Sequence, residues 1–102
     1  MYTLITAAAT AEAYRLKSAL NGEEVVLGDY MELPDVLVRL GKVITLPNPK
    51  SAAYTHQMLA LCLDKNINSV YVLREDEREL LFNAKQLFRE YDIQIGTADD
   101  KI

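Results

Sequence analysis

Short apolar segments that alternate with helical patterns limit the fold of this chain more than any other feature of its sequence. Segments of three to five residues that are apolar and rich in β-branched side chains are typical of buried strands. Such segments cover residues 2–6, 24–28, 43–46, 69–73 and 93–95. Between them, apolar residues recur at helical spacing. Strands that alternate with helices predict an α/β domain, because successive parallel strands need a crossover connection.

The predicted helices have recognisable ends. Residues that favour helix boundaries are Thr10, Pro34, Ser51 and Asp76 at the starts and Asn21-Gly22 at one end. Glu79 also follows Asp76 at the spacing of a capping box. We therefore predict a single Rossmann-like three-layer domain over residues 1–96, with a mostly parallel sheet of about five strands and a tail over 97–102.

The net charge and the cysteine content exclude some classes of partner and indicate the cellular compartment. The net charge of −4 argues against nucleic acid and anionic membranes, which both attract basic surfaces. Cys62 is the only cysteine, so an internal disulfide is impossible and nothing indicates secretion. The first ten residues lack the basic and long apolar regions of a signal peptide. We expect a cytoplasmic protein without a membrane partner.

The carboxyl ends of the predicted strands are where a ligand site is expected, because open parallel sheets bind ligands there. The polar residues that the pattern places at this rim are Thr6, Thr10, Asp29, Lys50, Ser51 and Arg74. Lys50 and Arg74 supply positive charge, and Ser51 would stand at a helix N-terminus that favours anions. One hypothesis is therefore that the rim binds a nucleotide or an anionic metabolite. The alternative is that these are ordinary solvated side chains.

The loop after the first strand argues against a dinucleotide. The motif G-x-G-x-x-G lets the backbone approach a pyrophosphate closely, whereas residues 6–11 read Thr-Ala-Ala-Ala-Thr-Ala. Asp29 lies about where a ribose-binding acid would stand, but an acid without the glycines is weak evidence. A Walker A motif is absent as well. We expect a Rossmann-like turn and no cofactor.

No catalytic or metal-binding constellation is evident in the sequence. His56 is the only histidine, and it has no Cys at metal-ligand spacing and no serine or acid at triad spacing. We expect His56 on a helix face and Cys62 as a buried, inert thiol. The acidic run at residues 75–77 favours a charged helix start over a cation site. These patterns predict no catalytic residue and no metal ligand.

Phe82 falls on the helix face opposite a regular apolar stripe. The stripe consists of Leu80, Ala84, Leu87, Phe88 and Tyr91. An aromatic side chain exposed on the other face suggests a contact surface. Our hypothesis is that Phe82 helps to form a homodimer or another protein interface.

Several short motifs occur in one order and spacing from residue 4 to residue 96. They are Leu4-Ile-Thr6, Val25-Val-Leu-Gly-Asp29, Leu46-Pro47, Tyr54, Leu59-Ala-Leu-Cys62, Ile67-Asn-Ser-Val70, Asp76, Glu79-Leu80-Leu81 and Tyr91-Asp92-Ile93. In these motifs the chain resembles the pre-ATP-grasp domain, the Rossmann-like N-terminal domain of ATP-grasp ligases such as the large chain of carbamoyl phosphate synthetase.

Two departures from that family shape what the resemblance implies. The first turn of the family often reads Thr-Gly-x-Gly, whereas this chain has alanines. The nucleotide, magnesium and catalytic residues of the family lie mainly in ATP-grasp domains, which we do not expect in this chain. The resemblance therefore implies a non-catalytic, substrate-side or interaction module. We expect it to act as a homodimer or as the partner of a separate ATP-grasp ligase subunit.

Overall fold

The computed structural model describes residues 2–20, 24–41 and 43–97. In chain order the elements are β1 (Tyr2–Ile5), α1 (Ala11–Ala19), β2 (Val25–Asp29), α2 (Asp35–Arg39), β3 (Val43–Thr45), α3 (Tyr54–Asp64), β4 (Ile67–Tyr71), α4 (Glu75–Asn83), α5 (Lys85–Arg89) and β5 (Gln94–Gly96). All five predicted strands are confirmed, with small shifts of their bounds. The predicted helix end at Asn21-Gly22 and residues 98–102 of the predicted tail lie outside the described residues.

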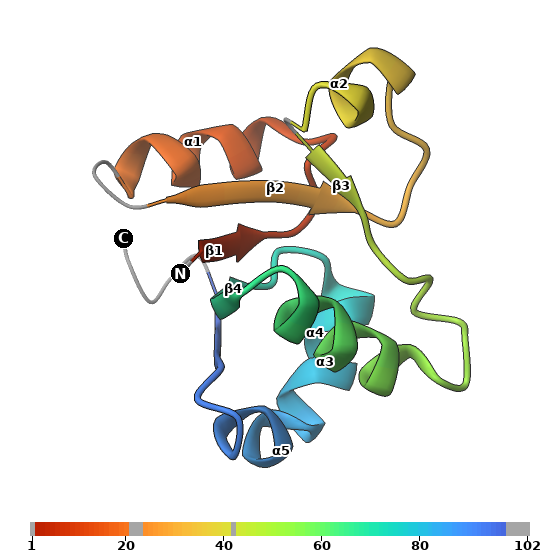
Figure 1. Cartoon of the computed structure of the whole chain (residues 1–102), viewed down its shortest axis with the longest axis vertical. Helices are drawn as coiled ribbons and strands as arrows, with labels where there is room; N and C mark the ends of the chain where they lie inside the picture. Colours follow the sequence, from red (N-terminus) through yellow and green to blue (C-terminus); the bar gives the residue numbers. More distant parts are fainter. Residues whose placement is uncertain (1, 21–23, 42, 98–102) are drawn as a thin grey trace.

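The five strands form one sheet in the order β3-β2-β1-β4-β5. Every neighbouring pair is parallel, so the sheet is wholly rather than mostly parallel. Helices α1 and α2 cover one face, and α3, α4 and α5 cover the other (Figure 1). The predicted α/β three-layer fold is therefore confirmed. The strand order reverses direction between β1 and β4, which is where open sheets of this kind form a crevice.

Each face of the sheet has its own apolar core. On the α1 side the buried residues are Ile5, Ala8, Ala13, Leu16, Leu20, Leu27 and Val43. On the other side the core is larger and is centred on Leu4, Tyr54, Met58, Cys62, Val70, Val72, Leu81, Phe88 and Ile95. Alternate residues of one strand, such as Leu4 and Ile5, serve opposite cores because strand side chains alternate in direction.

Two predicted helix starts are wrong. Ser51 does not cap α3, which begins at Tyr54 with Ala53 at its N-cap. Asp76 does not cap α4 either, because the helix already begins at Glu75, and the carboxylate of Asp76 accepts a hydrogen bond from a distant tyrosine instead. Thr10, by contrast, accepts from the Ala13 backbone N–H as predicted.

The predicted apolar stripe of the last helix is only partly confirmed. The helix is interrupted at Ala84, which separates α4 from α5. Phe88 is buried as expected, whereas Tyr91 lies beyond α5 and is half exposed. The interruption rotates the following residues relative to α4, so a single helical period does not extend over both helices. None of the helices in the described part of the chain is long and apolar enough to cross a bilayer.

Gly28 lets β2 pack closely against the residues of β3 and its continuation. A Cβ at this position would lie 2.9 Å from Leu46 Cδ2 and 3.1 Å from Ile44 Cγ1. We expect Gly28→Ala to lower the free energy of unfolding by about 1–3 kcal/mol, because an extra methyl group in a packed core forces its neighbours to move. Urea unfolding measures this loss. A variant within about 0.5 kcal/mol of the wild type would contradict the close packing.

Candidate functional site

Asp29 is the centre of a polar cluster at the carboxyl ends of the strands. It ends β2, and its side chain is fully buried. Oδ2 accepts a hydrogen bond from the Ala9 N–H at 3.1 Å, and Oδ1 accepts one from the Met31 N–H at 3.3 Å. Asp29 thus ties the loop after β1 to the loop after β2.

Arg74 completes this cluster from the far side of the crevice. Its Nε donates to Asp29 Oδ1 at 2.9 Å, and its Nη2 donates to Oδ2 at 2.8 Å. Arg74 follows β4, so its side chain crosses the end of β1 to reach the end of β2. Below this crossing, Thr6 Oγ1 accepts from the Leu73 N–H at 2.9 Å. The crevice between β1 and β4 is therefore spanned by the chain's own polar groups.

The ion pair stabilises the charged forms of both partners. Burial acts to raise the pKa of Asp29, but the hydrogen bonds from Arg74, Ala9 and Met31 outweigh it and hold the pKa below its ordinary value. The hydrogen bond to Asp29 raises the pKa of Arg74. Each Asp29 oxygen already accepts two hydrogen bonds, which uses its acceptor capacity. The carboxylate has no lone pair to offer to a ligand while this arrangement persists.

Tyr30 extends the cluster toward α4. The guanidinium carbon of Arg74 lies 5.2 Å from the centre of the Tyr30 ring, within the range of a cation–π contact. The Tyr30 hydroxyl donates to Asp76 Oδ2 at 2.8 Å, and this hydrogen bond raises the pKa of Tyr30. The rim therefore carries a chain of contacts from Asp29 through Arg74 and Tyr30 to Asp76.

The turn after β1 is built from buried alanines. Ala7 adopts a left-handed conformation with φ of 60°, so the turn after β1 is made without glycine. Ala7 and Ala8 are both buried. The turn that leads from β1 toward α1 is therefore formed by alanines where a dinucleotide motif has glycines.

The other sequence-predicted rim residues make local contacts. Thr10 donates to the Ala7 carbonyl at 2.8 Å and caps α1. Ser51 Oγ accepts from the Ala53 N–H at 3.2 Å. Lys50 is exposed, and its backbone N–H donates to Asn48 Oδ1. Within the described residues, the structure thus joins Asp29 to Arg74 directly, and Thr6 binds the Leu73 N–H next to Arg74. Thr10, Lys50 and Ser51 are not hydrogen-bonded to any of these residues.

An apolar surface lies beside this rim, on α2 and the residues that flank it. None of the α2 residues is buried. We use the name α2 surface for the exposed apolar side chains Met31 (48%), Val36 (54%), Val38 (38%) and Leu40 (65%). Next to them is a cavity of about 610 Å³ lined by Tyr30, Met31, Glu32, Leu33, Asp35, Val38, Arg39 and Thr45. The α2 surface has no counterpart among the residues predicted from the sequence.

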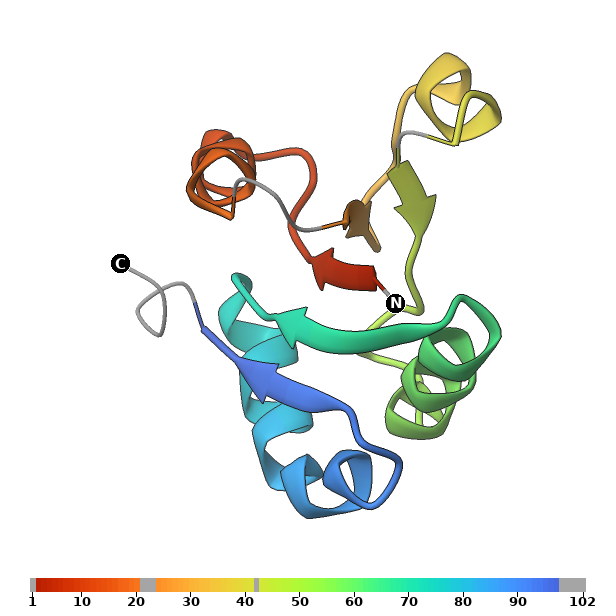
Figure 2. The same ribbon diagram turned by 60° about the vertical axis from the view of Figure 1, so that its left-hand side comes forward.

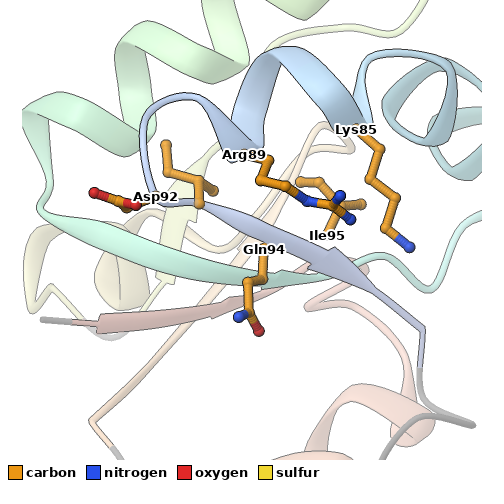
Figure 3. A pocket seen from close by; sticks show the side chains of 6 residues that line it. Lys85, Arg89, Asp92, Gln94 and Ile95 are labelled. Atoms are coloured by element: carbon orange, nitrogen blue, oxygen red, sulfur yellow. The ribbon is translucent and has the colours of Figure 1, made fainter.

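A second cavity, of about 470 Å³, lies at the opposite edge of the sheet, between α5 and β5. Lys85 and Arg89 extend from α5 along the β5 strand, while Asp92 and Gln94 point away from them (Figure 3). Lys85 also lies 5.0 Å from the ring centre of Phe82. No rim residue predicted from the sequence lines this cavity.

Glu77 is a buried acid that the sequence analysis missed. Its side chain is fully buried in the core below α4. Oε2 accepts a hydrogen bond of 2.6 Å from the Tyr54 hydroxyl, and Oε1 has no hydrogen-bond partner. Burial raises the pKa of Glu77 to about 7. The spacing in the sequence could have predicted this burial, because Glu77 precedes Leu81 by one helical turn and so lies on the same apolar face of α4.

Three further residues singled out in the sequence are His56, Cys62 and Phe82. His56 is exposed on α3, as expected. Cys62 is buried, which raises the pKa of its thiol to about 12, so its reactive thiolate form is disfavoured. Phe82 lies on α4 and is 37% exposed, less than the residues of the α2 surface. Among the residues that the structure describes, no three His, Cys, Asp or Glu side chains are placed to hold a metal ion.

The sequence matches no protein-family model and no curated protein.

Proposed function

We propose that this chain is a non-catalytic interaction module that binds another protein through the α2 surface. The observation that carries the proposal is the exposure of α2. Val36, Leu37, Val38 and Leu40 make the helix apolar around most of its circumference, and only Leu37 packs partly against the core. A helix that is apolar all round is typically buried. An apolar patch exposed beside polar residues is typical of a protein interface.

The strand rim supports this function better than ligand binding. Asp29 uses its acceptor capacity on Arg74 and two backbone N–H groups, and Thr6 accepts from the Leu73 backbone. A ligand that binds the Asp29 carboxylate at the crevice between β1 and β4 would have to break these bonds. The cluster instead fixes the loop that leads into α2, because the Met31 N–H donates to Asp29. We infer that the rim holds the α2 surface in place.

The resemblance to the pre-ATP-grasp domain suggests two kinds of partner. One is a separate ATP-grasp ligase subunit, and the other is a second copy of this chain. Both would meet the module in the cytoplasm, the compartment that the sequence predicts. Either partner would cover apolar area that the isolated chain leaves in water, which is the main favourable contribution to protein association.

A photo-crosslinking residue at position 36 tests the proposal. We expect a crosslinker in place of Val36, in cells that produce the chain, to give a covalent adduct with one defined protein. A crosslinker in place of Glu12 is the matched control, because Glu12 is exposed on α1, away from the α2 surface. A product at position 36 that is either a second copy or an ATP-grasp ligase supports the proposal. No adduct at position 36, or the same adducts at both positions, contradicts it.

A further inference from the structure

In the described part of the chain, no strand pairs with the outer edge of β3, which lies beside the α2 surface. β3 is the last strand of the sheet on that side, and Figure 2 shows it next to α2. The Leu46 N–H donates to the Asp29 carbonyl of β2 at 2.9 Å. Because backbone groups alternate in direction along a strand, Val43 and Thr45 direct their N–H and C=O groups away from β2. The edge therefore offers two donors and two acceptors to a further strand.

The charges around the α2 surface would complement the charges of a second copy of the chain. Asp35 begins α2, and Arg39 ends it one turn later. Glu32 adds a further acid to the wall of the adjoining cavity. When two such helices pack antiparallel, the acidic start of each lies near the basic end of the other. A purely acidic or purely basic partner would leave one of these charges without a counterion.

The opposite edge of the sheet is unsuited to pairing with itself. Lys85 and Arg89 lie along β5 (Figure 3), and a two-fold axis there would bring four cations together. Charged side chains, lysine above all, are a common protection of edge strands against pairing. The β5 edge of the sheet therefore lies beside two cations, which disfavour pairing with a second β5 edge. The β3 edge lies beside exposed apolar residues.

We propose that the partner of the α2 surface is a second copy of this chain, joined edge to edge through β3. This inference rests on the proposed function and names its partner. A two-fold axis at Ile44 places Val43 opposite Thr45 of the second copy, with both backbones in position to exchange hydrogen bonds. The same axis places the two α2 helices antiparallel on one face, where their apolar side chains cover each other. The result is a continuous sheet of ten strands, twice the five of one copy.

Sedimentation equilibrium over a range of protein concentrations tests this dimer. We expect the wild type to be a dimer, and Leu40→Glu to weaken self-association by more than about tenfold, because the interface would bury an unpaired carboxylate. Arg39→Asp should also weaken it, and the double variant Asp35→Arg/Arg39→Asp should restore it. Phe82→Glu is the matched control on another exposed apolar residue and should leave the dimer unchanged.

The outcomes separate this inference from the proposed function. A wild type that stays monomeric at the highest concentration overturns the dimer, and so does a dimer that Phe82→Glu disrupts and Leu40→Glu does not. If the wild type is monomeric while the crosslinker at position 36 captures another protein, only the inference fails. Thermal unfolding confirms that each variant is folded, and restoration by the charge-swapped pair excludes simple damage to α2.

Discussion

Replacing Glu77 by Gln is expected to stabilise the protein at neutral and alkaline pH. The carboxyl group is fully buried, and one of its oxygens has no hydrogen-bond partner. Ionising it therefore costs free energy that the single hydrogen bond from Tyr54 does not recover. Gln keeps the shape of the side chain and can still accept from Tyr54, but it carries no charge.

The sign of the pH dependence follows from the raised pKa. The native pKa of Glu77 is about 7, against an ordinary value of 4.5. Between these values the folded protein holds a proton that the unfolded chain has released, so the free energy of unfolding falls as pH rises. The full loss is about 3 kcal/mol, since each pH unit in this range is worth about 1.4 kcal/mol. It is complete once the pH exceeds the native value.

Urea unfolding at several pH values measures this effect. Glu77→Gln should match the wild type near pH 5 and exceed it by about 2–3 kcal/mol near pH 8. Glu79→Gln is the matched control, because Glu79 is exposed on the same helix, and its curve should follow that of the wild type. A wild type whose stability does not fall over this range would contradict a buried, protonated Glu77.

The strands could be predicted because their signals are local. Each is a short apolar run between helical patterns, and parallel pairing follows from that alternation. The two failed helix starts show the limit of local signals. Asp76 has the spacing of a cap, but its carboxylate binds the hydroxyl of Tyr30, which is 46 residues away in the sequence. Ser51 similarly engages a neighbouring backbone N–H before the helix begins.

The position of the candidate site at the rim of the sheet could be predicted from the sequence. The ion pair between Arg74 and Asp29 could not. The rule that parallel strands end at one rim located Thr6, Asp29 and Arg74 correctly. It could not show that Arg74 turns inward to Asp29, 45 residues earlier in the chain, instead of outward to a ligand. The α2 surface was missed for a different reason. Apolar residues in a short helix predict burial, and only the structure shows that their own core does not cover them.

Breaking the Asp29–Arg74 pair is expected to destabilise the fold by several kcal/mol. In Arg74→Ala, the buried carboxylate of Asp29 would keep its two backbone donors but lose its positively charged partner. Removing one member of a buried pair costs about 3–5 kcal/mol, and the partial exposure of Arg74, 23%, places this variant toward the lower end. Arg89→Ala is the control, because Arg89 is an exposed cation.

A double-variant cycle with Asp29→Asn shows how the pair works. The amide oxygen can still accept from one of the two backbone N–H groups, and the neutral side chain no longer needs a cation, so Arg74→Ala should cost much less when it is combined with Asp29→Asn. In the wild type, the stability from the lowered pKa of Asp29 is present above the ordinary value of 3.8 and is lost as pH falls through the native value. Arg74→Ala should weaken this loss. If Arg74→Ala instead left stability unchanged, the pair would not hold the rim together, and Arg74 would be free to leave Asp29 and bind an anion.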